Sequence, residues 1–373
     1  MKVEFVDLKK QYLSIKSEID QAIASVLENA AFIKGKNVES FEHDFAELNK
    51  IKHCIGVGNG TDALVIALRS LNIGVGDEVI TVANSFIATS EAISAVGARV
   101  VFVDTDNQTY NIDVKKIEEK ITSKTKAIIP VHLYGQPAEM PEILRIAKNH
   151  NLFVIEDSAQ AHLAEYQNLD GNWQKVSTIG DLATFSFFPG KNLGAYGDAG
   201  AVVTNSDSLA EKVRKFANHG RIAKYNHEFE GYNSRLDGLQ AAILNVKLKY
   251  INIWTERRRE VARKYSELLS TIPQIITPYV NPKTKPAWHL YVIQAEKRDE
   301  LQKFLKENGI ATGIHYPIAL PNLHAYQYLG HKESDFPVAS RLQNEILSLP
   351  IFPEITEQEI EYVVDTIKKF YLG

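Results

Sequence analysis

The stretch Ser186-Phe-Phe-Pro-Gly-Lys-Asn-Leu-Gly-Ala-Tyr-Gly-Asp-Ala-Gly200 decides how this chain is interpreted. It places Lys191 in a glycine-rich loop at the end of the apolar run 182–188, which is typical of a buried strand. The glycines allow tight turns and close approach to a ligand. A lysine that attacks an aldehyde must be deprotonated and therefore needs a confined site. The alternative is an ordinary surface lysine, and this stretch alone does not separate the two.

Asp157 ends a second apolar run, 152–157, which also predicts a buried strand. In open α/β sheets, ligands bind beyond the carboxyl ends of the strands. A carboxylate there suits the protonated ring nitrogen of pyridoxal phosphate, whose cationic ring withdraws electrons from a carbanion. The alternative is that Asp157 caps the following helix. The presence of Lys191 further along favours the cofactor interpretation.

A third motif, Gly58-Asn-Gly-Thr-Asp-Ala-Leu64, lies between the strand-like run 54–57 and an amphipathic stretch that continues to Leu71. Free N–H groups and the dipole at a helix start bind anions. We therefore expect Gly60 and Thr61 to hold the cofactor phosphate. The motif matches neither the Rossmann nor the Walker glycine pattern.

In this order the three motifs resemble the fold-type I pyridoxal-phosphate enzymes, and the chain as a whole is similar to the nucleotide-sugar aminotransferases (the DegT or StrS family). The segments that carry the resemblance are Phe5–Leu8, Gly60–Leu64, Gly76–Ile80, Pro130–Gly135, Glu156–His162, Phe185–Lys191, Gly231–Asp237, Trp288–Tyr291, His315–Pro317 and Leu349–Pro353. The resemblance implies an α/β fold with a mostly parallel central sheet flanked by helices. It also implies a large cofactor-binding domain over 1–250 and a smaller C-terminal α/β domain over 251–373.

The resemblance assigns roles to the cofactor site. Lys191 matches the lysine that bonds to the cofactor and shuttles the proton, and Asp157 matches the partner of the ring nitrogen. Gln160 matches the side chain near the ring hydroxyl, and Ser186 matches a phosphate-binding hydroxyl. Phe86 is similar to the aromatic residue that stacks on the ring; the alternative is a core phenylalanine on a helix.

Further residues are implied at the rim of the site. Asn233 matches an asparagine that reaches the phosphate of a neighbouring subunit, which implies a homodimer with shared sites. The candidate substrate contacts are His162, Arg221, Lys224, His227, His315 and Tyr316. The basic segment 221–227 has a second interpretation as a solvated loop. Leu163 stands where the family often has glycine, and the segment 166–177 is longer than usual, so the entrance is expected to differ in shape.

The implied reaction moves an amino group, with glutamate as donor, to C3 or C4 of a nucleotide-linked deoxy or N-acetyl sugar for a surface glycan. The cofactor alternates between pyridoxal phosphate and pyridoxamine phosphate. Two alternatives remain: a sugar deoxygenase or dehydratase of the same family, and a non-catalytic regulatory protein. In the deoxygenase branch a histidine replaces the lysine, so Lys191 argues against it. Intact Lys191, Asp157 and Gln160 argue against a non-catalytic protein.

Composition indicates an ordinary cytoplasmic enzyme. The chain has 373 residues and a net charge of −4, so charge gives no reason to expect nucleic-acid binding. Its one cysteine, Cys54, lies in an apolar run and fits a reducing compartment. The N-terminus is too polar for a signal peptide, and we find no apolar stretch long enough for a bilayer.

Two metal-like patterns do not meet the requirements of a site. The segment 104–108 begins like a calcium loop but has glutamine at the third ligand position and lacks the required glycine. We expect a turn there instead. The histidines include no His-x-x-x-His pair, so no zinc site is predicted.

Periodicity adds a coarse secondary-structure map. Strands are expected at 78–82, 99–103, 127–131 and 290–293, and a helix at 300–308. Leu236, Leu239, Ile243, Val246 and Tyr250 form one helical stripe. This stripe predicts a packing helix that begins the smaller domain.

Overall fold

A computed structural model describes residues 1–373, and its central element is a seven-stranded sheet in the order β1-β9-β8-β5-β4-β2-β3. The strands are β1 (His53–Val57), β2 (Glu78–Val82), β3 (Arg99–Val103), β4 (Thr125–Ile129), β5 (Phe153–Asp157), β8 (Leu182–Ser186) and β9 (Gly200–Thr204). The five strands from β8 to β3 pair in parallel, and β9 runs antiparallel to both of its neighbours. The predicted mostly parallel sheet is confirmed.

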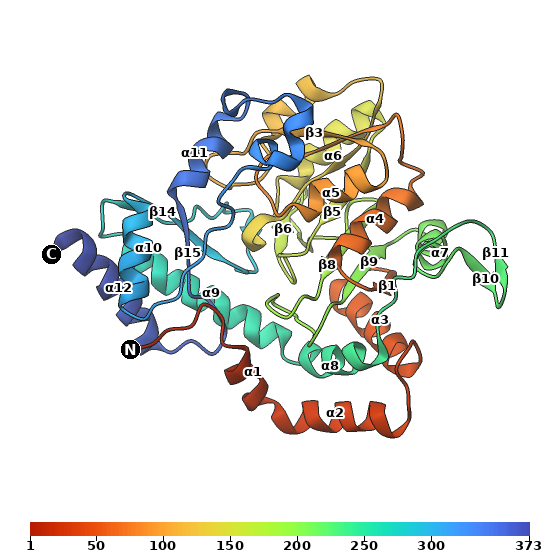
Figure 1. Cartoon of the computed structure of the whole chain (residues 1–373), viewed down its shortest axis with the longest axis horizontal. Helices are drawn as coiled ribbons and strands as arrows, with labels where there is room; N and C mark the ends of the chain where they lie inside the picture. Colours follow the sequence, from red (N-terminus) through yellow and green to blue (C-terminus); the bar gives the residue numbers. More distant parts are fainter.

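Helices cover both faces of this sheet, which explains why its strands are almost continuously apolar (Figure 1). Helices α4 (Gly60–Ser70), α5 (Ala88–Ala95) and α7 (Asp207–Phe216) bury apolar side chains on one face. The other face carries α3 (Lys36–Asn49), α6 (Met140–His150) and α8 (Gly238–Leu248). The carboxyl ends of the parallel strands meet at one edge, and the candidate site lies there.

A second, antiparallel sheet contains β12 (Ile275–Ile276), β14 (Tyr291–Ala295) and β15 (Ile346–Leu349). It packs with α9 (Ile251–Leu269), α10 (Arg298–Glu307) and α12 (Glu357–Leu372) around its own apolar cluster. The chain start joins this body through a parallel bridge between Val3 and Ile310, so both termini lie beside it (Figure 1). The division at residue 250 stays a prediction.

The C-terminal segment also returns to the large sheet. Residues 319–339 add apolar side chains to the core under α4 and α5, and the Tyr326 hydroxyl donates to Ser90 at 2.7 Å. The helix α11 (Pro337–Glu345) follows. The Asp104 carboxylate accepts from the Ala339 N–H at 3.0 Å, so it binds the start of this helix. The rest of the segment 104–108 forms the expected turn, with Asp106 accepting from Thr109 N–H.

The element boundaries follow local chemistry. β2 and β3 occupy the expected ranges, whereas β4 ends at Ile129 because Pro130 has no N–H to continue the ladder. The helical stripe that starts at Leu236 belongs to α8, which packs against α3 and α2 (Lys16–Glu28) of the large body. The expectation that this helix begins the smaller domain is wrong: α9 is the helix that enters the second body, because the chain turns near Tyr250 between the two.

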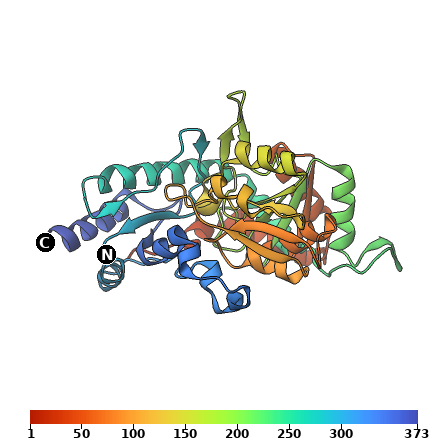
Figure 2. The same ribbon diagram turned by 90° about the horizontal axis from the view of Figure 1, so that it is seen from above.

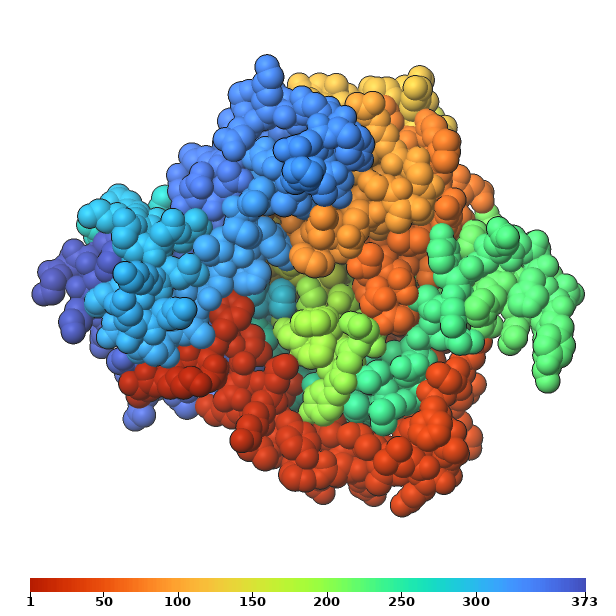
Figure 3. All heavy atoms as spheres, viewed as in Figure 1, coloured from red at the N-terminus to blue at the C-terminus, as the bar shows by residue number.

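Two hairpins stand out from the body. The pair β10 (Arg221–Ala223) and β11 (Asn226–His227) projects from the edge that also carries α7 (Figures 1 and 3). The long segment 166–177 folds with β6 (Glu165–Gln167) and β7 (Trp173–Lys175), to which β13 (Thr284–Lys285) adds a third strand. This yellow-green hairpin rises above the rest in Figure 2.

The remaining elements are short connections. The chain begins with α1 (Leu8–Ser14) beneath the large body. Short 3₁₀ helices lie at Val114–Lys116, Glu118–Lys120, Leu133–Gly135, Leu320–Asn322, His324–Leu329 and Glu333–Asp335. Every helix is too short or too polar to span a membrane.

Candidate active site

Lys191 lies in the connection between β8 and β9, at the carboxyl edge of the sheet. The loop is closed by backbone hydrogen bonds from Lys191 N–H to Phe188 O and from Ala195 N–H to Phe187 O, both 2.8 Å. Burial lowers the pKa of Lys191 to about 8, although the nearby charge of Asp157 opposes this shift. A larger fraction of the amine is therefore deprotonated near neutral pH than for a solvated lysine.

Asp157 ends β5, two strands from β9, and only 5% of its surface is exposed. Its carboxylate accepts from the Thr89 hydroxyl at 2.8 Å and from the Ala159 N–H at 3.2 Å. It forms no ion pair with Lys191, so its charge remains available for a cation in the site. The contact with Ala159 is local, and no helix begins directly after Asp157. The alternative that Asp157 caps a helix is therefore not supported.

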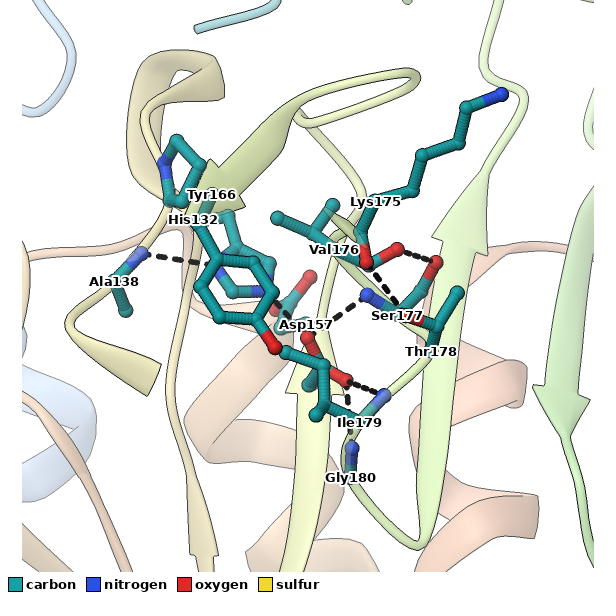
Figure 4. A network of polar contacts seen from close by, with 12 residues as sticks. His132, Ala138, Asp157, Tyr166, Lys175, Val176, Ser177, Thr178, Ile179 and Gly180 are labelled. Atoms are coloured by element: carbon teal, nitrogen blue, oxygen red, sulfur yellow. Dashed lines mark hydrogen bonds and ion pairs between the residues drawn. The ribbon is translucent and has the colours of Figure 1, made fainter. Parts of the chain in front are cut away.

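A buried network behind Asp157 fixes the end of β5 (Figure 4). The neighbouring Glu156 carboxylate accepts from His132 Nε2–H at 3.0 Å and from the N–H groups of Ser177 and Gly180, each at 2.8 Å. Ala138 N–H donates to His132 Nδ1 at 3.0 Å, so the His132 proton must be on Nε2. Burial opposes the charge, yet His132 and the backbone donors hold the pKa of Glu156 below its usual value.

Gln160 joins three segments of the site. Its carbonyl accepts from Tyr134 N–H at 2.7 Å, and its amide donates to the Tyr316 hydroxyl at 3.0 Å. The Tyr134 hydroxyl in turn donates to the backbone carbonyl of His315. His315 also pairs with the Ser348 hydroxyl at 2.8 Å, and burial, with Lys191 adding repulsion, lowers its pKa to about 4. The segment 315–316 is therefore brought against the large-sheet residues, as expected.

The start of α4 has the backbone geometry expected of an anion site, and its binding of phosphate stays a prediction. Asn59 caps the helix by accepting from Asp62 N–H at 2.8 Å, and the N–H groups of Gly60 and Thr61 before it have no hydrogen-bond partner. A Cβ at Gly60 would lie 2.7 Å from the Ser186 Cβ, and a Cβ at Gly200 would lie 2.4 Å from the Asn59 backbone. Three segments thus converge so closely that only glycine fits at two positions.

This donor set fits pyridoxal phosphate. A lysine with a lowered pKa and a buried carboxylate lie at one sheet edge, and the helix start beside Ser186 suits a phosphate. Lys191, Asp157, Gln160, Ser186 and the first turn of α4, including Thr61, are the residues that would hold the group. Their individual contacts with it stay predictions.

Phe86 and His162 lie in different environments from each other. Phe86 precedes α5 and is 53% exposed, so the alternative of a core phenylalanine is wrong. Its ring lies 5.9 Å from that of Tyr316. His162 is 1% exposed against Phe185, and neither of its ring nitrogens has a hydrogen-bond partner. Burial, with repulsion from Lys191, lowers its pKa to about 3, so the ring is neutral.

The backbone explains one departure from the family pattern. Leu163 has φ of +63°, in the left-handed region that favours glycine. The backbone at this position therefore adopts a conformation that favours glycine, and in this chain a leucine adopts it. Its side chain is buried in the cluster beneath β8 and adds to the wall there.

Asn233 and the basic segment lie outside the buried site. Asn233 is exposed, and the adjacent Ser234 hydroxyl accepts from Gly58 N–H at 2.9 Å, so this segment runs beside the motif that begins α4. Arg221, Lys224 and His227 are exposed on the projecting hairpin (Figure 1). Within one chain, the hairpin does not reach Lys191.

Two residues of the site were missed by sequence reasoning. Thr89 on α5 donates to Asp157, but no sequence motif near Thr89 predicts this contact. Asn192 donates to Ala287 O at 2.8 Å, and its side-chain oxygen lies 3.3 Å from His289 Nδ1. His289 lies in the segment 288–291, which carries part of the family resemblance but to which the sequence analysis assigned no function. Burial, with repulsion from Lys191, lowers the pKa of His289 well below its usual value.

Comparisons with known proteins agree with this geometry. The family model described as "DegT/DnrJ/EryC1/StrS aminotransferase family" matches residues 13–368. A "Pleiotropic regulatory protein" of Geobacillus stearothermophilus is 49% identical, covering 100% of this chain and 99% of the relative. The "dTDP-3-amino-3,6-dideoxy-alpha-D-galactopyranose transaminase" of Aneurinibacillus thermoaerophilus is 46% identical, covering 99% of both. The crystal structure of S. venezuelae DesV in complex with a ketimine intermediate is 40% identical, with a TM-score of 0.97, covering 100% of this chain and 99% of that one.

Proposed function

We propose that this chain, which belongs to the DegT/DnrJ/EryC1/StrS aminotransferase family and is a pyridoxal-phosphate-dependent aminotransferase of nucleotide sugars, uses glutamate to aminate C3 of a nucleotide-linked keto sugar. The observation that carries the proposal is Lys191, with its lowered pKa, at the same sheet edge as the buried carboxylate of Asp157. The choice of C3 over C4 is supported by the name of the Aneurinibacillus relative. We assign the product to a surface glycan and the reaction to the cytoplasm.

When bound, pyridoxal phosphate supplies an aldehyde that bonds to amines and a ring that withdraws electrons. The residues of the chain move the proton and stabilise the charge. Lys191 Nζ would take a proton from the α-carbon of the donor and deliver it to the carbon of the bound group that carried the aldehyde, and a positioned amine of this kind accelerates proton transfer by roughly 10²–10⁴-fold. Asp157 keeps the ring nitrogen protonated, because its buried charge is not neutralised by an ion pair within the chain.

The same residues serve both halves of the reaction. The donor leaves as a keto acid before the keto sugar enters, so one site must accept two substrates in turn. Lys191 then moves the proton in the opposite direction. Gln160 and Tyr316, which are hydrogen-bonded to each other at 3.0 Å, form the wall on the side of the segment 315–316. We assign sugar recognition to His315 and Tyr316 at this wall, and we keep His162 as a weaker candidate because its ring is buried.

We also propose that the active form is a homodimer, in which Asn233 of one copy reaches the phosphate site of the other. Asn233 is exposed although it runs beside the start of α4, and the basic hairpin projects from the same edge of the chain. Neither forms a hydrogen bond or ion pair with Lys191, Asp157 or Ser186 of its own chain, and Asn233 pairs instead with Asn218. In the dimer, Arg221, Lys224 and His227 would meet the diphosphate of the nucleotide, whose negative charge their side chains complement.

A regulatory role is the second candidate, because the Geobacillus relative is named a pleiotropic regulatory protein. Lys191, Asp157 and Gln160 are all intact here, and a protein without catalysis has no need for a half-buried lysine of lowered pKa. The deoxygenase alternative is disfavoured by the same lysine.

Single-turnover spectroscopy tests the proposal. The pyridoxamine form of the purified enzyme is mixed with nucleotide-linked 3-keto sugars, 4-keto sugars, or common α-keto acids, and the return of the aldehyde form is followed by absorbance. We expect rapid conversion with the 3-keto sugar. The free keto sugar should react much more slowly, because remote binding energy serves the reacting centre. Preference for the 4-keto sugar would change the carbon, and turnover restricted to α-keto acids would overturn the substrate class.

A further inference from the structure

Lys247 is a lysine with no exposed surface, on the inner side of α8. Its ammonium donates to the backbone carbonyl of Gly194 at 2.7 Å and lies 4.3 Å from the centre of the Tyr196 ring. An ammonium has three N–H donors, and here only one has a hydrogen-bond acceptor. Lys247 also forms no ion pair, so its buried charge is poorly compensated.

Such a group costs stability. Burial lowers the pKa of Lys247 to about 8, and Glu354 only partly offsets this shift. The folded protein therefore binds this proton less tightly than the unfolded chain, and keeping the charge at neutral pH opposes folding. A methionine of similar length would fill the space without that penalty. A costly residue of this kind is expected where it serves function.

The carbonyl that Lys247 holds belongs to the loop of Lys191. Gly194 lies three residues after Lys191, and a Cβ there would be 2.3 Å from the Pro189 carbonyl oxygen, so the loop is folded tightly on itself. Two turns earlier on α8, Gln240 accepts from Tyr196 N–H at 2.8 Å. The lime-green loop descends from the sheet toward α8 in Figure 1. Two side chains of one helix thus fix the far side of this loop.

The near side of the loop is fixed by other contacts. Ala195 N–H donates to Phe187 O, and Asn192 donates to Ala287 O, each at 2.8 Å. These bonds do not restrain the carbonyl of Gly194, for which Lys247 is the donor. The rigid helix α8, packed against α2 and α3, therefore sets the position of the loop from below.

We propose that Lys247 is a positioning residue, which holds the loop of Lys191 through the Gly194 carbonyl so that the Lys191 amine lies correctly for proton transfer. The inference rests on the proposed role of Lys191. Displacement of a reacting group by about 1 Å can cost on the order of 10²-fold in rate. Loss of Lys247 should therefore lower kcat without a matching loss of stability.

The test replaces Lys247 with methionine in the full-length, cofactor-loaded enzyme. We expect kcat per bound cofactor to fall by about 10- to 100-fold, KM for the nucleotide sugar to stay within about twofold, and Tm to stay the same or rise. A residue with a purely structural role would lower Tm and leave kcat per bound cofactor unchanged. The matched control is Lys249→Met, two residues later, where the lysine is exposed and pairs with Glu18 at 3.0 Å. The Lys249→Met variant should leave kcat per bound cofactor, KM and Tm unchanged.

A second variant covers the case in which Lys247→Met does not fold. Lys247→Gln keeps a neutral N–H donor on a shorter side chain, so it should recover part of kcat. A kcat within twofold of the wild type in soluble Lys247→Met overturns the inference, and the same result in Lys247→Gln overturns it where only that variant folds. Failure of both to fold also overturns it, because that outcome gives Lys247 a structural role. Borohydride labelling of the wild type separates this test from the proposed function: a label away from Lys191 overturns the role of Lys191, whereas a label on Lys191 with unaltered Lys247→Met kinetics overturns only the role of Lys247.

Discussion

The inner wall and the outer rim of the site differ in how far a single chain completes them. On the inner wall, Asp157 and Gln160 are 5% and 4% exposed, and each of these side chains is hydrogen-bonded to at least one other segment of the chain. On the rim, Phe86 is 53% exposed, and the hairpin residue Tyr225 is 83% exposed. The wall is buried and held by hydrogen bonds within the chain, whereas the rim presents exposed side chains.

This difference separates chemistry from recognition. The groups that must hold charge and move protons lie at the sheet edge, where packing fixes them and burial lowers the pKa of Lys191. The groups proposed to meet the nucleotide lie on the projecting hairpin and beside the exposed Asn233, where a second copy can approach (Figure 3). Substitutions in the wall should therefore change kcat, and substitutions on the rim should change binding.

The largest effect is expected for Lys191→Ala on the wall. Without the amine, proton transfer loses its base, so we expect turnover to fall by about 10⁴-fold, the upper end of what a positioned base contributes. The half-reaction with the amino donor, followed by absorbance, measures this. Lys303→Ala on the exposed face of α10 serves as the control and should keep the full rate. Substantial turnover by Lys191→Ala would break the assignment of the wall to chemistry.

Asp157→Asn should have the next largest effect. The substitution keeps the shape but removes the charge that stabilises the protonated ring nitrogen, so kcat should fall by roughly 10²–10³-fold, on the scale of losing a preorganised electrostatic interaction. Thr89→Val keeps the Asp157 charge and removes its 2.8 Å hydrogen bond, together with the 3.0 Å contact between the Thr89 and Ser85 hydroxyls, so the loss of kcat should be smaller. Near-normal kcat in Asp157→Asn would remove the role of this carboxylate.

The pH dependence of reconstitution tests whether the wall confines Lys191. The amine reacts with cofactor only when deprotonated, and its pKa is about 8, so the rate for apo-protein should rise about tenfold per pH unit below pH 8 and then level off. Asp157 raises this pKa, so Asp157→Asn should shift the midpoint lower. Stopped-flow mixing with pyridoxal phosphate measures both. A midpoint near 10.5 would mean that Lys191 behaves as a solvated lysine.

Asn233→Ala probes the rim at the proposed dimer contact. We expect cofactor affinity to fall by about tenfold, because one neutral hydrogen bond to phosphate is lost. Cofactor titration of the apo-protein measures this. If the loss also disables turnover, mixing this variant with Lys191→Ala subunits should restore activity, because one mixed site then has both residues. A fully active monomer at assay concentration would contradict the shared site.

Lys224→Ala on the hairpin should have the smallest effect. An exposed charge contributes little and is screened by salt, so KM for the nucleotide sugar should rise by only about two- to fivefold, with kcat unchanged. The increase should shrink at high ionic strength. The same substitution should leave the half-reaction with glutamate unaffected. A loss in kcat of either half-reaction would place the hairpin in the chemistry and remove the contrast between wall and rim.

Much of the fold and the wall was predictable because the signals are local. The apolar runs at 78–82 and 99–103 mark β2 and β3, and the resemblance at 156–162 and 185–191 identified the candidate chemistry. The contact of Thr89 with Asp157 was not predictable, because the two residues are brought together only by packing of α5 on the sheet. The predicted position of α8 was wrong for a similar reason, since a stripe of apolar residues on a helix does not specify which surface the helix packs against.

The sequence by itself determined the class of site, because a lysine in a glycine-rich loop, an aspartate at a strand end and a glycine before a helix each follow from local backbone chemistry. It also determined the alternation of strands and helices that makes the sheet mostly parallel. Only the tertiary structure decided the properties that depend on surroundings: the low pKa of Lys191 arises from burial, and the isolation of Lys247 arises from the packing of α8 against the loop of Lys191. Burial and electrostatics are sums over neighbours distant in the chain, so they exist only once the fold has brought those neighbours together.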